Sequence, residues 1–315
     1  MKLLSQVITS SSRVQSHRLL TPVCYSRGLA ASVIHKYNPK ATYVSLARGC
    51  SDNRSVIVTG ASRGIGKVIA LRLAADGYNV CVNDISANEA GCDDLVTQIK
   101  GMGRKACSAI ADVAKRDEVK QMVQTSVREL GPLDTMIANA GISQVKAVLD
   151  LTEHDFERMF AVNVIGVHNC FAEAAKQMID QGSCRPDRPG KLIGASSIVA
   201  FKPFVMLPTY SVSKWAVRGL VQSYAMELAE HNITANSYAP GVVGTAMWDL
   251  IDAGIADKKG LKRGEVIRKV VHDATALGRV SVPEDVAKLV SFLASSDSDF
   301  VTGQTQVVDG GIVFT

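Results

Sequence analysis

Residues 55–66 of the chain read Ser-Val-Ile-Val-Thr-Gly-Ala-Ser-Arg-Gly-Ile-Gly. The first five form a short apolar run typical of a buried strand, and residues 65–76 have the apolar spacing of an amphipathic helix. The glycines therefore lie on a turn from strand to helix. Backbone N–H groups of such a turn, together with the helix N-terminus, can face an anion that glycine lets approach closely. We interpret the stretch as a pyrophosphate-binding loop, with an ordinary structural turn as the alternative.

Short apolar runs alternate with helical stretches through the rest of the chain. We expect strands at 55–59, 79–84, 105–110, 134–138, 191–195, 233–238 and 305–308. We expect helices at 65–76, 88–100, 115–130, 152–179, 208–230 and 283–294. Alternation of this kind implies βαβ units. The predicted fold is a single doubly wound, Rossmann-type α/β domain over residues 52–315, with a parallel seven-stranded sheet and helices on both faces.

The net charge of +5 is concentrated at one end of the chain. Residues 1–51 contain seven Lys or Arg and no Asp or Glu, so the remaining residues carry 28 basic and 30 acidic side chains. The predicted folded part therefore has no basic excess that would favour a nucleic-acid partner. The basic, Ser-rich and Leu-rich segment resembles a mitochondrial presequence, which would place the protein in the matrix. The alternative is a disordered tail on a cytoplasmic protein.

Cysteine spacing and hydropathy argue against two other classes. The seven cysteines form no Cys-x-x-Cys pair and no cluster with histidine, so we expect neither a metal site nor a disulfide framework. No apolar run reaches the roughly 18–20 residues of a membrane-spanning helix, and we expect no membrane insertion.

Three side chains have the spacing of a proton-transfer site. Tyr210 lies thirteen residues after Ser197 and four residues before Lys214, so the tyrosine and the lysine share one helix face. The ammonium is expected to favour tyrosinate and to lower the tyrosine pKa. Ser197 ends a strand and can donate a hydrogen bond to a carbonyl oxygen, whereas strand alternation points its neighbour Ser196 away. A Tyr-x-x-x-Lys pair alone also occurs by chance, so its combination with the glycine loop is what carries weight.

Together these motifs resemble the short-chain dehydrogenase/reductase family. The similarity extends over residues 55–315 and includes Asp112-Val113, Asn139-Ala140-Gly141, Asn163, Pro240-Gly241, Thr302-Gly303-Gln304 and Val308–Gly311. Within the family the chain is most similar to acetoin/diacetyl reductases, also called 2,3-butanediol dehydrogenases. The segments that carry this similarity are 210–220, 240–248, 277–286 and the Gly-Ile-Val-Phe stretch at 311–314.

The resemblance implies a nicotinamide cofactor. Asp84, at the end of the second expected strand, can bind the adenosine ribose hydroxyls and would repel a 2′-phosphate, which favours NAD(H) over NADP(H). Arg63 argues the other way, since many NADP-dependent relatives place a basic group there. The expected cofactor-binding residues are Thr59, Gly60, Ser62, Arg63, Gly64, Ile65, Gly66, Asp84, Asp112, Val113, Asn139, Ala140, Gly141, Tyr210, Lys214, Pro240, Gly241, Val243 and Thr245.

The resemblance also implies a catalytic tetrad and an apolar substrate pocket. Asn163 would hold a water chain to Lys214, and Tyr210 would be the acid/base with Ser197 as the second donor. The positive nicotinamide of NAD⁺ would act together with the Lys214 ammonium to lower the tyrosine pKa. The expected substrate residues are Ser197, Ile198, Phe204, Tyr210, Gly241, Met247 and Trp248. We expect residues 245–276 to form a lid that orders over ligand.

Three function hypotheses remain at this point. The first is NAD-dependent interconversion of a small secondary alcohol and ketone of the acetoin, diacetyl or butanediol kind. The second is a 3-oxoacyl carrier protein reductase that uses NADPH. The third is a nucleotide-binding scaffold without chemistry, against which the complete tetrad argues. By resemblance, helices 115–130, 152–179 and 208–230 would pair subunits into a homodimer or homotetramer.

Overall fold

The computed structural model describes residues 54–315. The expected presequence at 1–51 lies outside the described residues. The described part contains one seven-stranded sheet in which every strand pair is parallel, in the order β3-β2-β1-β4-β5-β6-β7. The strands are β1 Ser55–Val58, β2 Asn79–Asp84, β3 Ala106–Ile110, β4 Leu133–Ala138, β5 Gly190–Ala195, β6 Ile233–Pro240 and β7 Thr305–Val308. The predicted fold class is confirmed, with strand boundaries within a few residues of those expected.

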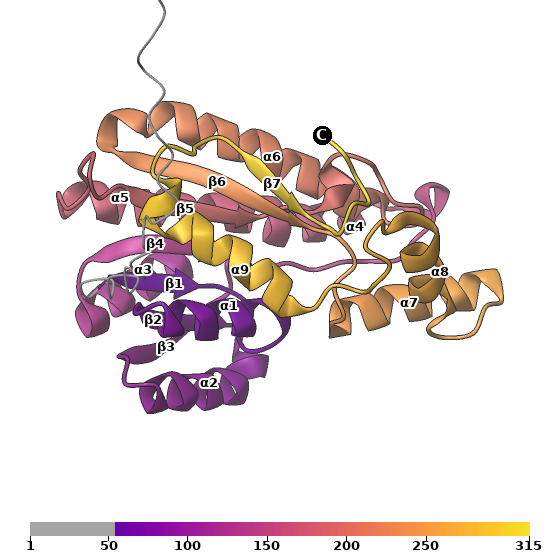
Figure 1. Ribbon diagram of the computed structural model, residues 1–315, viewed down its shortest axis with the longest axis horizontal. Helices are drawn as coiled ribbons and strands as arrows, with labels where there is room; N and C mark the ends of the chain where they lie inside the picture. Colours follow the sequence, from indigo (N-terminus) through magenta and orange to yellow (C-terminus); the bar gives the residue numbers. More distant parts are fainter. Residues whose placement is uncertain (1–53) are drawn as a thin grey trace, which may run out of the picture. The chain divides into compact units, whose positions relative to one another are not determined.

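Helices cover both faces of the sheet (Figure 1). One face packs against α1 Gly64–Ala75, α2 Glu89–Gly101 and α9 Pro283–Ala294, and the other against α3 Arg116–Leu130, α5 Gly166–Asp180 and α6 Pro208–Glu227. The strands are apolar on both faces because both are buried against helices, as parallel sheets require. Val56 and Val58 point into the first core, and Ile57 between them points into the second. Two apolar cores therefore hold the strand ends, and the loops that follow them, in fixed positions.

The expected single helix at 152–179 is wrong in its middle. The chain forms α4 Glu153–Phe160, then a π-helical turn at Ala161–Ile165, and only then α5. The π-helical turn surrounds Asn163, whose side chain is fully buried and hydrogen-bonded outside its own helix. Turns of this kind interrupt α-helices frequently at functional sites. Apolar periodicity cannot reveal one extra residue in a turn, so the sequence pattern suggested a continuous helix.

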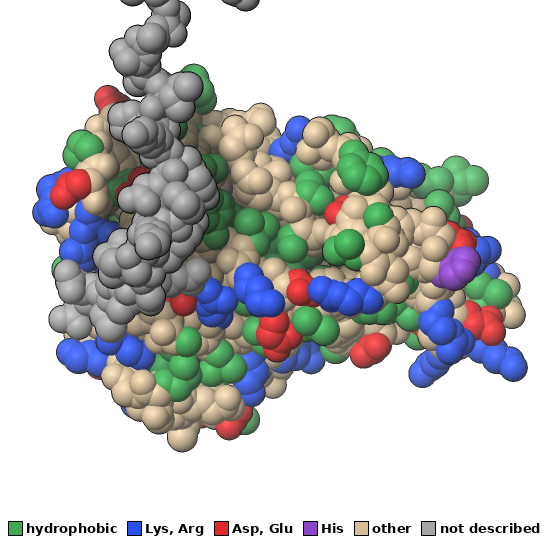
Figure 2. Space-filling model, in the orientation of Figure 1, with side chains coloured by type: hydrophobic (Ala, Val, Ile, Leu, Met, Phe, Trp, Pro, Cys, Tyr) green, Lys and Arg blue, Asp and Glu red, His purple; other side chains and the backbone are tan. Residues whose placement is uncertain are grey.

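Two helices at one end of the molecule form the segment expected to be a lid. They are α7 Ala246–Lys259 and α8 Glu265–Ala274, and Asp252 of α7 accepts hydrogen bonds from the backbone N–H groups of Gly264 and Ile267 at the start of α8. Lys258, Lys259, Lys262 and Arg263 are exposed on the turn between them, and basic side chains gather at that end of the surface (Figure 2). The lid thus has a solvated, basic tip and an apolar inner side.

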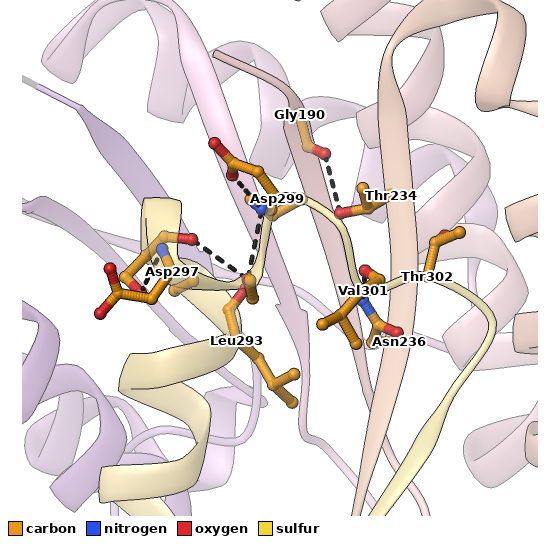
Figure 3. A network of polar contacts seen from close by, with 12 residues as sticks. Gly190, Thr234, Asn236, Leu293, Asp297, Asp299, Val301 and Thr302 are labelled. Atoms are coloured by element: carbon orange, nitrogen blue, oxygen red, sulfur yellow. Dashed lines mark hydrogen bonds and ion pairs between the residues drawn. The ribbon is translucent and has the colours of Figure 1, made fainter. Parts of the chain in front are cut away.

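A buried cation fixes the chain after α9 to the amino end of β5. The Lys191 ammonium, on a side chain 1% exposed, donates to Asp299 Oδ1 at 2.6 Å and to Ser298 Oγ at 3.3 Å. Beside it, Asn236 Nδ2 donates to Val301 O at 2.6 Å, so residues 298–302 are held along β6 (Figure 3). Burial lowers the Lys191 pKa, and the Asp299 carboxylate opposes this shift.

We expect Asp299→Asn to destabilise the protein by about 3 kcal/mol, because it leaves a buried lysine without its counter-charge. Lys191→Met removes the charge that needs a partner and should be close to neutral. Thermal and urea unfolding of both variants would measure the difference. Equal losses in the two variants would contradict an electrostatic origin.

Candidate functional site

The glycine loop is shaped to bind an anion. Gly60 and Gly64 have φ of +62° and +57°, a region that L side chains rarely adopt. A Cβ on Gly66 would lie 2.3 Å from Gly60 O and 2.5 Å from Asn139 Nδ2, so only glycine fits there. No side chain caps the first turn of α1, and that turn contains no acidic residue. Its N–H groups are therefore available to a phosphate, as predicted.

Thr59 and Asn139 join the glycine loop to the end of β4 by hydrogen bonds. Thr59 Oγ1 accepts hydrogen bonds from the N–H groups of Asn139 and Ala140, both at 3.0 Å. The Asn139 side chain donates to Thr59 O at 2.8 Å and to Gly60 O at 3.1 Å, and its Oδ1 accepts from Tyr238 at 2.8 Å. These residues set the shape of the loop through its backbone.

Asp84 lies beside the loop, with its carboxylate already engaged. Oδ2 accepts from the Ser62 hydroxyl at 2.6 Å and from its N–H at 3.2 Å. Oδ1 accepts from the Ile85 N–H at 2.9 Å and from Asn88 Nδ2 at 2.8 Å. Four donors match the roughly four lone-pair sites of a carboxylate, so a ribose hydroxyl would have to replace one of them. Arg63 is exposed, so its guanidinium is open to solvent.

The other expected cofactor residues lie around the same end of the sheet. Asp112 Oδ1 accepts from the Ala114 N–H, and Val113 O accepts from Asn169 Nδ2 on α5. Gly64 faces Thr245, whose Cγ2 would lie 3.8 Å from a Cβ on that glycine. Ile65, Pro240, Gly241, Val243 and Thr245 line one cavity next to the loop. The carboxyl ends of β1, β2, β4 and β6 thus converge, as expected for a ligand site in a doubly wound sheet.

Tyr210 and Ser197 meet at this cavity. Ser197 is 7% exposed, its hydroxyl accepts a hydrogen bond from the Val199 N–H at 3.3 Å, and it lines the same cavity as Tyr210. Burial raises the pKa of Tyr210 to about 12, and the Ser197 side chain offsets part of the rise. The neighbouring Ser196 hydroxyl instead donates to Lys214 O, which supports the predicted choice of Ser197. At neutral pH the phenol is protonated and can donate.

Desolvation sets the direction of the Tyr210 pKa shift in the free protein, whereas the expected lowering, which includes the positive charge of a bound nicotinamide, stays a prediction. The Lys214 ammonium lies 5.5 Å from the centre of the Tyr210 ring and donates to Ala195 O at 2.8 Å. The side chain is 3% exposed, and burial lowers its own pKa to about 8. Desolvation acts on both groups and disfavours the charged form of each. In the free protein Tyr210 is therefore uncharged at pH 7, and it lies beside a lysine whose pKa is about 8.

Asn163 is connected to the tetrad through the backbone and a serine. Its Oδ1 accepts from the Ile142 N–H at 2.9 Å, and its Nδ2 donates to Ile142 O and to Ser213 Oγ, each at 3.0 Å. Ser213 donates in turn to Tyr210 O at 2.7 Å. A Cβ on Gly141 would lie 3.3 Å from Asn163 Oδ1 and 3.5 Å from Lys214 Nζ, so this glycine keeps the space between them open.

A cavity of about 180 Å³ opens above Tyr210. All seven expected substrate residues line it: Ser197, Ile198, Phe204, Tyr210, Gly241, Met247 and Trp248. The aromatic rings of Phe204 and Trp248 pack edge to face at 6.1 Å. The hydroxyls of Ser197 and Tyr210 therefore offer a carbonyl two polar groups in a mostly apolar space, whose other polar side chains are those of Thr245 and Lys202.

Sequence reasoning missed part of the cavity wall. Further lining residues come from the loop before α6, from the lid helices and from the segment after β7: Lys202, Pro203, Leu207, Ile251, Val270, Ala274, Ile312 and Val313. The helical apolar spacing of α7 could have suggested Ile251. No local signal marks the segment after β7, because its place in the wall depends on how distant elements pack.

No helix in residues 54–315 is long and apolar enough to cross a membrane. No group of three or more His, Cys, Asp or Glu side chains within this range could hold a metal ion.

Comparison with known proteins places the chain among similar sequences and structures. A family model described as short chain dehydrogenase matches residues 54–255. A short-chain dehydrogenase/reductase of Armillaria gallica is 45% identical over 264 residues, which cover 84% of this chain and 97% of that protein. L-2,3-butanediol dehydrogenase of Corynebacterium glutamicum is 40% identical, with 83% and 99% covered. The (S)-acetoin forming diacetyl reductase of Staphylococcus epidermidis is 41% identical, also with 83% and 99% covered.

A solved structure shares the fold and carries a cofactor. The blue fluorescent protein from a metagenomic library, in complex with NADPH, superposes with a TM-score of 0.72 at 30% identity. The superposition covers 83% of this chain and 98% of that one. The fold therefore accommodates a nicotinamide dinucleotide in at least one similar protein.

Proposed function

Because the chain belongs to the short-chain dehydrogenase family, an oxidoreductase family that acts on CH–OH and C=O groups, we propose that it interconverts small vicinal ketones and their alcohols with NAD(H). Diacetyl, acetoin and 2,3-butanediol are the proposed substrates. The observation that carries the proposal is the placement of Ser197 and Tyr210 in an apolar cavity next to the glycine loop. A carbonyl compound that enters the cavity meets both hydroxyls there.

The residues present fit a nicotinamide dinucleotide. The glycine loop and the uncapped start of α1 would hold the pyrophosphate, Asp84 the adenosine ribose, and Lys214 the nicotinamide ribose. When bound, the cofactor supplies the hydride that reduces the carbonyl carbon. Ser197 holds the carbonyl oxygen, and Tyr210 gives it a proton. The raised tyrosine pKa keeps that proton in place until the oxygen becomes alkoxide-like and more basic than a phenolate.

A four-carbon vicinal ketone suits the cavity on two grounds. Its two methyl groups can contact the side chains of Ile198, Phe204 and Met247, and its oxygens can reach the two hydroxyls. Two relatives at 40% and 41% identity carry the names butanediol dehydrogenase and diacetyl reductase. A long acyl thioester would need an open path past the Phe204–Trp248 pair.

Steady-state oxidation of NADH and NADPH, with diacetyl, acetoin and an acetoacetyl thioester assayed in parallel, tests the proposal. Fast NADH turnover on the vicinal ketones and slow turnover on the thioester are expected. Preference for NADPH and the thioester would instead make the protein a 3-oxoacyl carrier protein reductase. Cofactor binding without turnover of any ketone would favour a scaffold.

We expect Asp84→Ala to raise the ratio of the NADPH to the NADH specificity constant by about tenfold or more. The substitution removes a negative charge from the position of the 2′-phosphate, and it leaves the exposed Arg63 free to pair with that phosphate. Initial rates with both cofactors measure this ratio. Asn88→Ala is the matched control, since it removes one partner of the same carboxylate and leaves the charge. An unchanged ratio in Asp84→Ala would refute the assignment of NAD(H).

A further inference from the structure

The segment Asp309–Val313, here called the 309–313 loop, is folded by one buried carboxylate. Asp309 is 7% exposed, its Oδ1 accepts from the Gly311 N–H at 2.8 Å, and its Oδ2 accepts from the Val313 N–H at 2.7 Å. Gly310 and Gly311 follow with φ of +71° and +85°. One side chain therefore bends its own loop back on itself at two glycines that permit the turn.

The loop is wedged between the end of β6 and the end of α8. A Cβ on Gly241 would lie 2.7 Å from Asp309 Cβ and 3.1 Å from Ile312 Cδ1, so the loop closes on β6 only because that residue is glycine. On the other side the Leu277 N–H donates to Gly310 O at 3.0 Å. A Cβ on Gly311 would lie 2.8 Å from Ala276 Cβ. The loop thus ties the lid to the sheet with little room on either side.

Ile312 and Val313 then become part of the cavity wall. Both line the same cavity as Ser197, Tyr210 and Trp248, although they lie about a hundred residues from Tyr210 in the sequence. Their positions depend on the two bonds to Asp309, since Gly311 and Val313 are the residues whose N–H groups it holds. The carboxylate does not itself line the cavity, so it acts on the substrate only through these apolar side chains.

We propose that Asp309 is a positioning residue for substrate selection, and that the 309–313 loop limits the length of the ketone that the cavity accepts. The inference rests on the proposed function, because it concerns the ketone bound beside Tyr210. Short aliphatic vicinal diketones fit against Ile312 and Val313, and longer or aromatic ones are excluded by them. Displacing the loop enlarges the cavity without touching the hydroxyls or the glycine loop.

The test compares two changes of the loop in the full chain. Asp309→Asn replaces one acceptor oxygen by an amide that faces an N–H donor, and deletion of residues 312–315 removes the wall itself. For each variant we would measure kcat and KM with 2,3-butanedione, 2,3-heptanedione and 1-phenyl-1,2-propanedione, and KM for NADH. Both variants are expected to raise the specificity constant for a long diketone relative to 2,3-butanedione by about tenfold, through KM, with KM for NADH unchanged.

Asp134→Asn is the matched control for general destabilisation. Asp134 is also buried, accepts from the Ser55 N–H at 2.9 Å and pairs with Arg188, but lies at the amino end of β4, whereas the cavity lies at the carboxyl ends of the strands. It should lower thermal stability without altering the preference among diketones. If Asp309→Asn behaves like this control, or if neither loop variant shifts the preference, the proposal is overturned.

A second measurement does not depend on the substrate. Trp248 lines the cavity, and Trp215 on α6 is the other tryptophan of the chain, so Trp215→Phe leaves a single reporter. Acrylamide quenching of Trp248 fluorescence in this background should rise about twofold when the loop is altered, and it should be unchanged in Asp134→Asn. Unaltered quenching in both loop variants would overturn the proposal. If the unaltered protein reduces no diketone, the proposed function fails, while the quenching still decides the role of the loop.

Discussion

Replacing Tyr210 by phenylalanine is expected to lower kcat for ketone reduction by about a thousandfold while leaving the Kd for NADH unchanged. The variant keeps the ring that shapes the cavity and removes the phenolic hydroxyl that would donate the proton. Ser197 can still hold the carbonyl oxygen, so some rate should remain, and Ser197→Ala should cost less, about a hundredfold. Stopped-flow measurement of a single turnover separates the chemical step from cofactor release.

Tyr224→Phe is the matched control for the loss of a tyrosine hydroxyl. Tyr224 lies on the same helix, α6, and its hydroxyl hydrogen-bonds to His168 Nδ1 at 2.9 Å, away from the residues that line the cavity. Its variant should reduce ketones at a rate within about twofold of the unaltered protein. A Tyr210→Phe enzyme that is as active as this control would refute Tyr210 as the acid.

The fold class and the residues that meet at the site could be predicted because both depend on patterns between residues close in the sequence. Apolar runs with glycine at their ends predicted strands followed by tight turns, and strand ends of a parallel sheet meet at one edge. That rule alone brings Gly60, Asp84, Asn139 and Ser197 together. Motif spacing within one helix did the same for Tyr210 and Lys214.

What could not be predicted depends on three-dimensional packing. The π-helical turn around Asn163 adds one residue to a helical turn, and the spacing of apolar residues does not indicate such an insertion. Asp84 was expected to accept hydrogen bonds from a ribose, and nothing in the sequence indicated that Ser62, Ile85 and Asn88 already supply four donors to its carboxylate. The 309–313 loop reaches the cavity only because Gly241 and Ala276, from two distant elements, leave it a narrow space.

The direction of the Tyr210 pKa shift in the free protein could not be predicted from the sequence for a related reason. A charge-pair argument from sequence spacing includes the attraction between Lys214 and a tyrosinate but omits the desolvation that both groups undergo. In the structure desolvation is the larger effect on each: it raises the pKa of Tyr210 and lowers that of Lys214. The free protein is therefore built around an ammonium that is costly to bury.

Lys214→Met is accordingly expected to stabilise the protein and abolish its activity. The pKa of Lys214 is about 8 in the folded protein, against about 10.4 for an unfolded lysine, so the unfolded chain binds more protons between these values. The burial cost is therefore complete below about pH 8, shrinks as the pH rises, and vanishes above about pH 10.4. At pH 7 the variant should gain about 3 kcal/mol of unfolding free energy, and at pH 10.5 almost none. Urea unfolding at the two pH values measures this difference.

The same titration governs catalysis in the unaltered enzyme. The specificity constant for ketone reduction should fall above about pH 8 as the ammonium near Tyr210 loses its proton, whereas Lys214→Met should show only a low, pH-independent residual rate. Lys191→Met is the matched control, since it removes a second buried lysine of residues 54–315, which has its own carboxylate partner at the amino end of β5. That control should keep the pH profile and the activity. If Lys214→Met is stabilised and inactive while Lys191→Met is active, Lys214 is retained for chemistry at the expense of stability. A Lys214→Met protein that is less stable than the unaltered protein at pH 7 would contradict the desolvation argument.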